Sequence, residues 1–354
     1  MVEKVIPLII AGGKGSRFWP LSREDCPKQF LSIDGGDSLL KRAFLRAQTI
    51  AVNAVPYIIA GEDQREQVCA ALSGEEGNYQ FIGEPFGHNT AIAVFWACKC
   101  LKEKEERGII AVLPSDHQIP DQEGFADTLK KAVAVADLKQ SLVVIGVTPH
   151  YPATGYGYVE RGRKEYLENE TYYHVHRFVE KPHREKARRY LKKGTYHWNC
   201  GMSVFPLTAI FDIFDRHLPS FGQKFTDIGL YDQEGLAKAY RESENVSFDV
   251  GILEKEKETY LVEAEFRWDD VGSYNSLGSL IRPDEQLNIL KGNHILKDVR
   301  NSVILTDNRL CAVVGMKDVV IAEDRGVLLI CPRRRVEEIK EIVAALKEEN
   351  QKYQ

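Results

Sequence analysis

The sequence predicts an α/β protein in which a mostly parallel sheet is covered by helices on both faces. Short apolar stretches with the length of buried strands occur at residues 5–11, 56–61, 79–82, 109–113 and 141–147. Helical stretches alternate with these strands, and that alternation is typical of a doubly wound parallel sheet. From Pro283 onwards the pattern changes to short strands separated by polar turns, which predicts a smaller, β-rich C-terminal part.

The helices and the later strands follow from local sequence signals. Asp37-Ser38 can cap a helix that runs to about Ile50, and Pro182 can start a helix that runs to about Lys192. Residues 91–101 are apolar nearly all round, so we expect a buried helix there. The remaining expected elements are helices over 64–72 and 123–137, strands over 172–179, 262–266, 303–305, 310–314, 319–321 and 327–331, and a terminal helix from about Arg334.

The composition is that of an ordinary globular chain and disfavours several classes of protein. Of the 354 residues, 44% are hydrophobic and 28% are charged, and this length allows two domains. The net charge of −5 offers no general attraction to nucleic acid or to an acidic membrane. No stretch approaches the ~20 apolar residues of a membrane span, and a strand begins too early for a signal peptide. Seven dispersed cysteines favour reduced thiols in the cytoplasm over a disulfide framework or a zinc site.

The most informative stretch directly follows the first strand. Gly12-Gly13-Lys14-Gly15-Ser16-Arg17 has three glycines, whose backbone amides can approach a ligand that a Cβ would hold away. Its two cations and Arg23 supply positive charge, and residues 11–23 contain no acid, so the loop is suited to phosphate. The dinucleotide-binding pattern would need glycine where Phe18 stands, and the P-loop would need glycine where Leu8 stands. A glycine-rich turn with a solvated basic rim is the alternative interpretation.

The residues after the loop carry a family resemblance. The loop continues as Trp19-Pro20-Leu21-Ser22-Arg23 and Pro27-Lys28-Gln29-Phe30. The whole pattern resembles the mannose-1-phosphate guanylyltransferase family of sugar-nucleotide pyrophosphorylases, and the resemblance extends over about residues 5–280. It implies a Rossmann-like nucleotidyltransferase domain over 1–282, followed by a small β-helix or β-roll with a terminal helix over 283–354. It further implies the short form of the family, without an added isomerase domain.

Two aspartates are expected to bind a divalent metal. Asp116 stands at the carboxyl end of the strand expected over 109–113, where a carboxylate is well placed for Mg²⁺, which prefers hard oxygen ligands. The resemblance implies the same role for Asp116, in an Asp-His pair, and for Asp270, in a W-x-D-V-G-S segment that starts at Trp268. Asp269 is expected to cap a turn or to be a solvated neighbour.

The remaining site residues are assigned by the resemblance. Glu84, Asn89 and Thr90 are expected to contact base and ribose, although His88 stands where the family has arginine. The Asn89-Thr90 pair can equally cap the helix that follows, and both roles can hold together. The residues implied for the sugar and its phosphate are Gly155, Tyr156, Gly157, Glu180, Lys181 and Asn199. Those implied for the triphosphate are Gly12, Gly13, Lys14, Gly15, Ser16, Arg17 and Lys28, with Arg17, Lys28, Lys181, Asp116 and Asp270 in the catalytic set.

The resemblance implies transfer of GMP from GTP to α-D-mannose 1-phosphate, with Mg²⁺ as cofactor and pyrophosphate as leaving group. The attacking phosphate is already an anion, so positioning and cations matter more than a strong base. Two alternatives stay open: a pyrophosphorylase for another hexose 1-phosphate and nucleotide, and a non-catalytic subunit that binds sugar nucleotides. We expect no nucleic-acid or membrane partner, and a homodimer. The apolar stripe of the terminal helix either docks on its own chain or forms such a contact.

Overall fold

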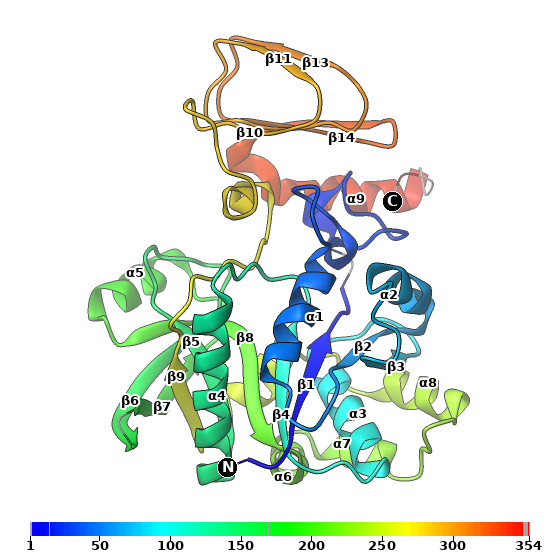
Figure 1. The fold of residues 1–354 in the computed structure, drawn as a ribbon, viewed down its shortest axis with the longest axis vertical. Helices are drawn as coiled ribbons and strands as arrows, with labels where there is room; N and C mark the ends of the chain where they lie inside the picture. Colours follow the sequence, from blue (N-terminus) through cyan, green and yellow to red (C-terminus); the bar gives the residue numbers. More distant parts are fainter. Residues whose placement is uncertain (1, 14, 169, 350–352, 354) are drawn as a thin grey trace. The chain divides into compact units, whose positions relative to one another are not determined.

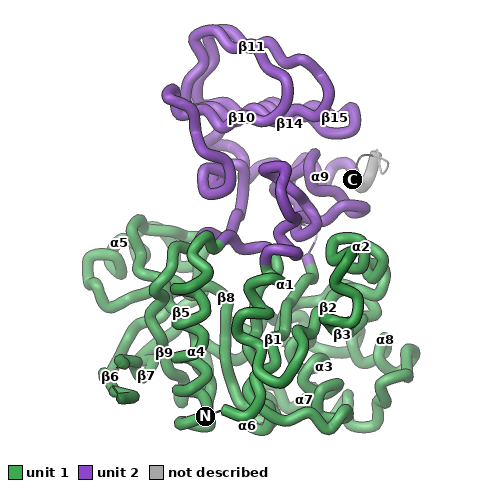
Figure 2. Tube along the Cα trace, viewed as in Figure 1, with its two compact units in different colours: residues 1–12, 43–115, 119–268 green, residues 13–42, 116–118, 269–354 purple. Residues whose placement is uncertain are grey.

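The computed structural model describes residues 2–13, 15–168, 170–349 and 353 (Figure 1). The chain divides into two compact units, shown in green and purple in Figure 2. The first unit comprises residues 1–12, 43–115 and 119–268, and the second comprises residues 13–42, 116–118 and 269–354. The second unit therefore contains most of the glycine-rich loop and the Asp116 segment as well as the C-terminal part. The domain boundary at residues 282/283 stays a prediction.

A nine-stranded sheet forms the centre of the first unit within the described residues. Its order is β3-β2-β1-β4-β8-β5-β9-β7-β6. The first four strands are parallel, β5 and β9 are parallel to each other, and β8 runs antiparallel between β4 and β5. The prediction of a mostly parallel sheet is confirmed. The bounds are β1 Val5–Ile10, β2 Tyr57–Gly61, β3 Gln80–Glu84, β4 Ile109–Pro114, β5 Leu142–Val147, β6 Tyr158–Leu167, β7 Glu170–Val179, β8 Tyr196–Pro206 and β9 Thr259–Glu263.

Helices cover both faces of this sheet because its strands bury side chains on both sides. On β1, Ile6 and Leu8 pack in one apolar cluster with the helix α3, which is buried nearly all round as expected. The helix α4 packs on the opposite face, against β4, β5, β8 and β9 (Figure 1). The helix bounds are α1 Leu39–Ile50, α2 Arg65–Ala71, α3 Thr90–Glu103, α4 Gln122–Lys139, α5 Arg184–Lys193, α6 Leu207–His217, α7 Pro219–Phe225 and α8 Gln233–Glu242.

Two local predictions in the first unit differ from the structure. The strand expected over 262–266 is β9, which begins at Thr259, because its pairing with β5 starts there. The helix expected from Pro182 begins at Arg184, and His183 is its N-cap. The strand expected over 172–179 is β7, but its hairpin partner β6 was not predicted; β6 pairs with β7 and, through its first residues, with β8.

The C-terminal part of the second unit is a small β-helix. Parallel pairs connect β10 with β12, β12 with β14, and β11 with β13, while β15 returns antiparallel to β14. Residues that include Ile304 and Val313 fill its interior, so the β-helix prediction is confirmed. The bounds are β10 Ile289–Lys291, β11 His294–Lys297, β12 Val303–Leu305, β13 Cys311–Val314, β14 Val319–Asp324 and β15 Val327–Pro332.

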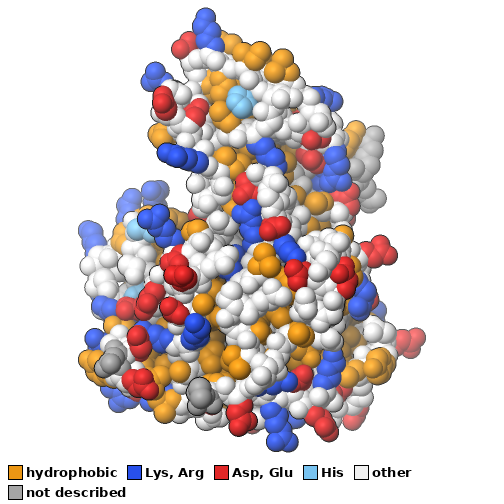
Figure 3. Space-filling model, viewed as in Figure 1, with side chains coloured by type: hydrophobic (Ala, Val, Ile, Leu, Met, Phe, Trp, Pro, Cys, Tyr) orange, Lys and Arg blue, Asp and Glu red, His pale blue; other side chains and the backbone are white. Residues whose placement is uncertain are grey.

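The terminal helix docks on its own unit. A 3-10 turn, Arg333–Glu338, leads into α9 (Ile339–Glu349). The expected apolar stripe, represented by Val336 and Ile339, packs in a cluster with β12 and β14. None of the described helices is long and apolar enough to cross a membrane. On the face in Figure 3, cationic and anionic side chains are interspersed, which agrees with the small net charge.

Candidate functional site

A pocket of about 260 Å³ in the second unit holds most of the residues expected to bind phosphate and metal. Its lining comes from three distant parts of the chain: the glycine-rich loop, the segment after β4, and the segment after residue 268. The lining residues are Gly15, Ser16, Arg17, Phe18, Lys28, Asp116, His117, Asp270 and Gly272. The fold therefore brings both predicted metal-binding aspartates to the same pocket as two predicted triphosphate-binding cations.

Lys28 ties these three parts together. Its Nζ donates to Oδ2 of Asp116 at 2.7 Å and to the backbone oxygen of Asp270 at 2.7 Å. The side chain of Lys28 is only 8% exposed. A buried ammonium needs partners to replace its lost hydration, and these two oxygens supply them. These contacts hold the side chain of Lys28 in one position in the lining of the pocket.

The glycine at position 15 is required by Lys28. Gly15 has a φ of +58°, and a Cβ built there would lie 2.3 Å from the Cβ of Lys28. Both the left-handed backbone and the absence of a side chain are therefore needed for the loop to lie against the lysine. Ser22 closes the loop, because its Oγ donates to the backbone oxygen of Gly15 at 2.6 Å.

Asp116 is held as a carboxylate. Burial by itself raises the pKa of Asp116, but the Lys28 ammonium and, less strongly, His117 lower that pKa to a net value below the ordinary range. Oδ1 of Asp116 lies 3.7 Å from Nε2 of His117. An ionised carboxylate at neutral pH is the form that can bind a divalent cation.

Asp270 lies on a constrained turn. Val271, the next residue, is fully buried with a φ of +47°, which is unusual for a β-branched residue. Oδ1 of Asp270 accepts a hydrogen bond from the amide of Gly272 at 3.0 Å, and a Cβ at Gly272 would collide with this carboxylate. The neighbouring Asp269 accepts from the amide of Val271 at 2.7 Å, which is the turn-capping role expected for it.

Burial raises the pKa of Asp269 to about 6 despite the hydrogen bond from Val271, with the charge of Asp270 adding to the rise. Two adjacent carboxyl groups thus differ in environment, and only the second lines the pocket. Arg17 lines it from the other side: its Nη1 donates to the backbone oxygen of Gly272 at 3.3 Å, and its side chain is 49% exposed. Gly13 has a φ of +124° with open space around it, and Lys14 lies outside the described residues.

All six residues expected to contact the sugar or its phosphate lie in the first unit. Nδ2 of Asn199 donates to Oδ1 of Asp249 at 2.7 Å, and the amide of Asn199 donates to the backbone oxygen of Gly157. A Cβ at Gly157 would lie 2.7 Å from Oε2 of Glu180 and 2.8 Å from the ring of Phe178, so a side chain at this position would displace its neighbours. Nζ of Lys181 contacts Oε1 of Glu180 at 2.6 Å and remains 59% exposed.

Aromatic rings surround Tyr156 in the same unit. Its ring lies 5.2 Å from Trp198 and 5.0 Å from Trp268, edge to face in both cases. Such a cluster gives a rigid apolar wall of the kind that packs against the C–H groups of a sugar ring. Gly155, also expected at the sugar, is exposed with no neighbouring atom in reach of an added Cβ.

The residues expected at the nucleoside lie at the ends of β3 and α3. Asn89 caps α3 through a hydrogen bond from the amide of Thr90 at 3.1 Å, so the capping role is confirmed while the ligand role stays a prediction. Thr90 Oγ1 accepts from the amide of Phe248 at 2.9 Å. Glu84 is 3% exposed, and burial raises its pKa to about 7 although Tyr240 donates to its Oε1 at 3.2 Å. Gly12 lies next to Glu84, because a Cβ added at Gly12 would be 3.6 Å from Oε2 of Glu84.

Sequence reasoning missed two residues of these groups. Asp249 was not assigned a role, yet it is the partner of Asn199, and burial together with Glu180 raises its pKa to about 6. A single-turn π-helix, Asp249–Leu253, begins at this residue, and such turns often occur at functional sites. Tyr240 donates to Glu84, but no sequence motif marks it, because a tyrosine on an amphipathic helix predicts only packing.

The residues present fit an ion that takes few ligands from the protein. Two carboxylates, Asp116 and Asp270, line the pocket, and no cluster of three or more His, Cys, Asp or Glu side chains in the described part of the chain is arranged to hold a metal. Mg²⁺ is commonly bound by one or two carboxylates, with water and substrate phosphates completing its shell. A closed structural zinc site would need four ligands and does not fit.

Most of the chain matches two protein-family models, and both matches agree with the fold and the pocket. Residues 6–287 match the nucleotidyl transferase family, and residues 292–346 match the mannose-phosphate isomerase/GMP-like β-helix domain. The glycine-rich loop, Lys28 and both pocket aspartates all fall within the first match. The class of protein defined by the fold and the site is therefore a nucleotidyltransferase with a C-terminal β-helix.

Individual relatives narrow this class. The chain is 33% identical to mannose-1-phosphate guanylyltransferase of Escherichia coli, over 98% of this chain and 76% of that protein. It is 34% identical to the xanthan biosynthesis protein XanB of Xanthomonas campestris, over 98% of this chain and 74% of that protein. A crystal structure described as mannose-1-phosphate geranyltransferase from Thermus thermophilus superposes with a TM-score of 0.86 at 30% identity, covering 97% of this chain and 99% of that one. The chain belongs to the mannose-1-phosphate guanylyltransferase family.

Proposed function

We propose that the protein transfers GMP from GTP to α-D-mannose 1-phosphate, giving GDP-mannose and pyrophosphate. The observation that carries this proposal is the pocket in which Lys28, Arg17 and two aspartates meet beside a glycine-rich loop suited to phosphate. The family membership supports the same reaction, because the Escherichia coli relative named above is a mannose-1-phosphate guanylyltransferase. The reaction joins two anions, and a pocket of cations with metal-binding carboxylates is what such a reaction requires.

In the proposed reaction, a phosphate oxygen of mannose 1-phosphate attacks the α-phosphorus of GTP. A new P–O bond forms there as the bond to the β-phosphate breaks, and pyrophosphate leaves in line with the attack. Lys28 and Arg17 would bind the triphosphate and stabilise the charge that develops on the departing pyrophosphate. Lys181 would bind the sugar phosphate. No strong general base is needed, so catalysis depends on alignment and on fixed positive charge.

The cofactor we propose is Mg²⁺, held by Asp116 and Asp270. Members of the nucleotidyl transferase family generally use a divalent metal, which supports this assignment. When bound, the ion would neutralise negative charge on phosphate oxygens. The lowered pKa of Asp116 keeps this ligand ionised at neutral pH.

For the remaining substrate contacts we propose Asn199, Glu180 and the Gly155-Tyr156-Gly157 turn at mannose, and Glu84, Asn89 and Thr90 at the guanosine. Asn199 and Glu180 can pair with sugar hydroxyls. Glu84 can accept from a base that carries N–H donors, as guanine does at N1 and N2. We further propose that the protein acts in the cytoplasm as a homodimer.

The proposal is tested by following pyrophosphate release with four nucleoside triphosphates, each combined with several hexose 1-phosphates. GTP with mannose 1-phosphate should give the highest kcat/KM. A strong preference for UTP with glucose 1-phosphate would instead support the alternative pyrophosphorylase. Tight binding of GDP-mannose without pyrophosphate release from any pair would support the non-catalytic alternative.

A further inference from the structure

The segment that carries Arg17 and Lys28 has little regular structure of its own. It contains two short 3-10 turns, Ser16–Phe18 and Lys28–Phe30. Between them, Arg23 and Cys26 exchange two backbone hydrogen bonds at 3.0 and 3.1 Å and close a small turn with Asp25 at its tip. Backbone in irregular structure is held in place chiefly by contacts with other elements. Those contacts therefore decide how accurately Lys28 is placed.

Several of these contacts come from the turn between β14 and β15. Asp324 and Val327 are a paired position of this hairpin, and the two residues between them, Arg325 and Gly326, have φ values of +45° and +81°. Two consecutive positive φ values are typical of the type I′ turn, which suits the twist of a hairpin. The backbone of this turn is therefore set by the hairpin of the β-helix, and it fixes the direction in which the side chains of Asp324 and Arg325 leave the backbone.

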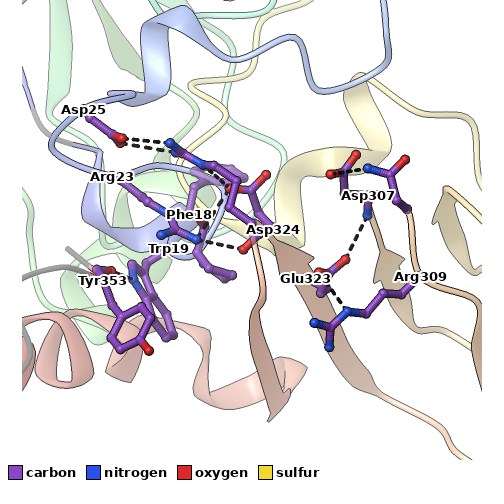
Figure 4. A network of polar contacts seen from close by, with 12 residues as sticks. Phe18, Trp19, Arg23, Asp25, Asp307, Arg309, Glu323, Asp324 and Tyr353 are labelled. Carbon is purple, nitrogen blue, oxygen red and sulfur yellow. Dashed lines mark hydrogen bonds and ion pairs between the residues drawn. The ribbon is translucent and has the colours of Figure 1, made fainter.

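Four charged residues form an alternating chain between the two turns (Figure 4). Nη2 of Arg23 donates to the backbone oxygen of Asp324 at 2.7 Å, and Arg23 is only 8% exposed. Arg325 contacts Asp25 with both terminal nitrogens, at 2.7 and 3.2 Å. Nε of Arg325 also donates to Asp324 at 2.9 Å, which links the two pairs. A bidentate arginine–carboxylate contact fixes direction as well as distance.

We propose that Asp324 and Arg325 are positioning residues that hold the phosphate-binding loop in its catalytic conformation. They lie outside the lining of the pocket and act through Arg23 and Asp25, which lie between Arg17 and Lys28 in the chain. On this view the β-helix is part of the catalytic apparatus. The inference rests on the proposed function of the pocket. A displacement of about 1 Å at a catalytic group can reduce turnover about 100-fold, so a modest loosening of the loop is measurable.

Exposed ion pairs contribute little to global stability, typically below about 1 kcal/mol. The side chains of Asp25 and Arg325 are 65% and 45% exposed, so variants of this pair should fold. Arg325→Ala should therefore lower kcat about fivefold while leaving the melting temperature nearly unchanged. Arg309→Ala is the matched control: Arg309 belongs to the same β-helix and lies 3.7 Å from Glu323, without contact to the loop (Figure 4). This control should keep full activity.

The decisive experiment is a charge exchange. Arg325→Asp should lower kcat about tenfold through repulsion of Asp25, and Asp25→Arg should do the same against Arg325. The double variant Asp25→Arg, Arg325→Asp should recover activity to within about threefold of the unmodified protein, because the pair is restored with its signs reversed. Amide exchange of residues 13–30, measured without substrate, should rise in both single variants and return in the double variant.

The exchange measurement separates this inference from the proposed function. If the unmodified protein makes no GDP-mannose, the proposed function fails, yet the protection of residues 13–30 still reports whether the hairpin holds the loop. The positioning role is overturned if Arg325→Asp leaves both kcat and protection unchanged. It is equally overturned if the double variant stays as impaired as the single ones, because the effect would then not arise from the contact between the two side chains.

Discussion

The Nζ atom of Lys28 lies 2.7 Å from Oδ2 of Asp116, although the two residues are 88 positions apart in the chain. The same nitrogen contacts the backbone oxygen of Asp270 at 2.7 Å, so one buried cation links the loop to both aspartate segments. Its charge lowers the pKa of Asp116 before any substrate binds. This arrangement explains why the loop needs glycine at position 15 and why Asp116 stays ionised.

Replacing Lys28 should impair both catalysis and stability. Lys28→Gln removes the charge and leaves Asp116 without its ammonium partner, which should lower kcat by at least about 100-fold and the free energy of unfolding by about 2 kcal/mol. Steady-state pyrophosphate release and chemical denaturation measure the two effects. Lys297→Gln, an exposed lysine of β11, is the control and should change neither. Normal turnover in Lys28→Gln would remove this residue from the catalytic set.

The two neighbouring aspartates should respond differently to the same substitution. Asp270→Asn should keep the fold but lower kcat by at least about 100-fold, because a ligand for the cation is lost. Asp269→Asn retains an acceptor for the Val271 amide and should keep turnover within about threefold. Titration of Mg²⁺ with each variant measures the difference. Equal turnover in both variants at the same Mg²⁺ concentration would refute the metal assignment.

Gly15→Ala tests the close approach of loop and lysine. The new Cβ would meet the Cβ of Lys28, and the φ of +58° also disfavours alanine, so kcat should fall at least about tenfold. Gly35→Ala shares the strain, with a φ of +86°, but has no atom within 4 Å of the added carbon. It should lose about 1 kcal/mol of stability and keep its activity. Similar kinetics for the two variants would show that backbone strain alone matters.

Glu84 should make stability depend on pH. Its folded-state pKa of about 7 lies above the ordinary value of 4.5, so the folded protein binds this proton more tightly than the unfolded chain does. The stabilisation is fully present below about pH 4.5 and is lost as pH rises through about 7. Glu84→Gln should therefore gain up to about 3 kcal/mol over the unmodified protein at pH 8 and little at pH 4.5. Denaturation midpoints at both pH values measure this, and a gain independent of pH would contradict it.

Asn199→Asp tests the sugar contacts separately from the triphosphate contacts. The substitution keeps the size of the side chain but places a carboxylate 2.7 Å from the position of Asp249, near Glu180. The KM for mannose 1-phosphate should rise about tenfold because an anionic substrate meets added negative charge and loses an amide donor. The KM for GTP should stay within about twofold. A parallel rise in both constants would argue against a specific role at the sugar.

Much of the fold was predictable because its signals are local. The apolar strands of the first half, the capped helix α1 and the buried helix α3 each follow from a few consecutive residues. Strand β7 was predicted, but its partner β6 was missed because its many charged residues do not form the apolar run of a buried strand. The candidate site shows the same dependence on local signals: Lys28 and Asp116, which stand in dense motifs, could be predicted as candidates and line one pocket, whereas Asp249 and Tyr240 could not be predicted.

The sequence by itself determined the glycine-rich loop with its cations, the alternation of strands and helices and the acidic residues at the ends of strands, because each depends on residue type and short-range spacing. Only the tertiary structure decided that Lys28 contacts Asp116, that burial raises the pKa of Glu84, and that Arg325 reaches Asp25 across 300 positions of chain. Such pairings depend on which elements become neighbours and on how much water they exclude. Neighbouring elements and excluded water are properties of the packed chain, so neither can be inferred from the local order of residues.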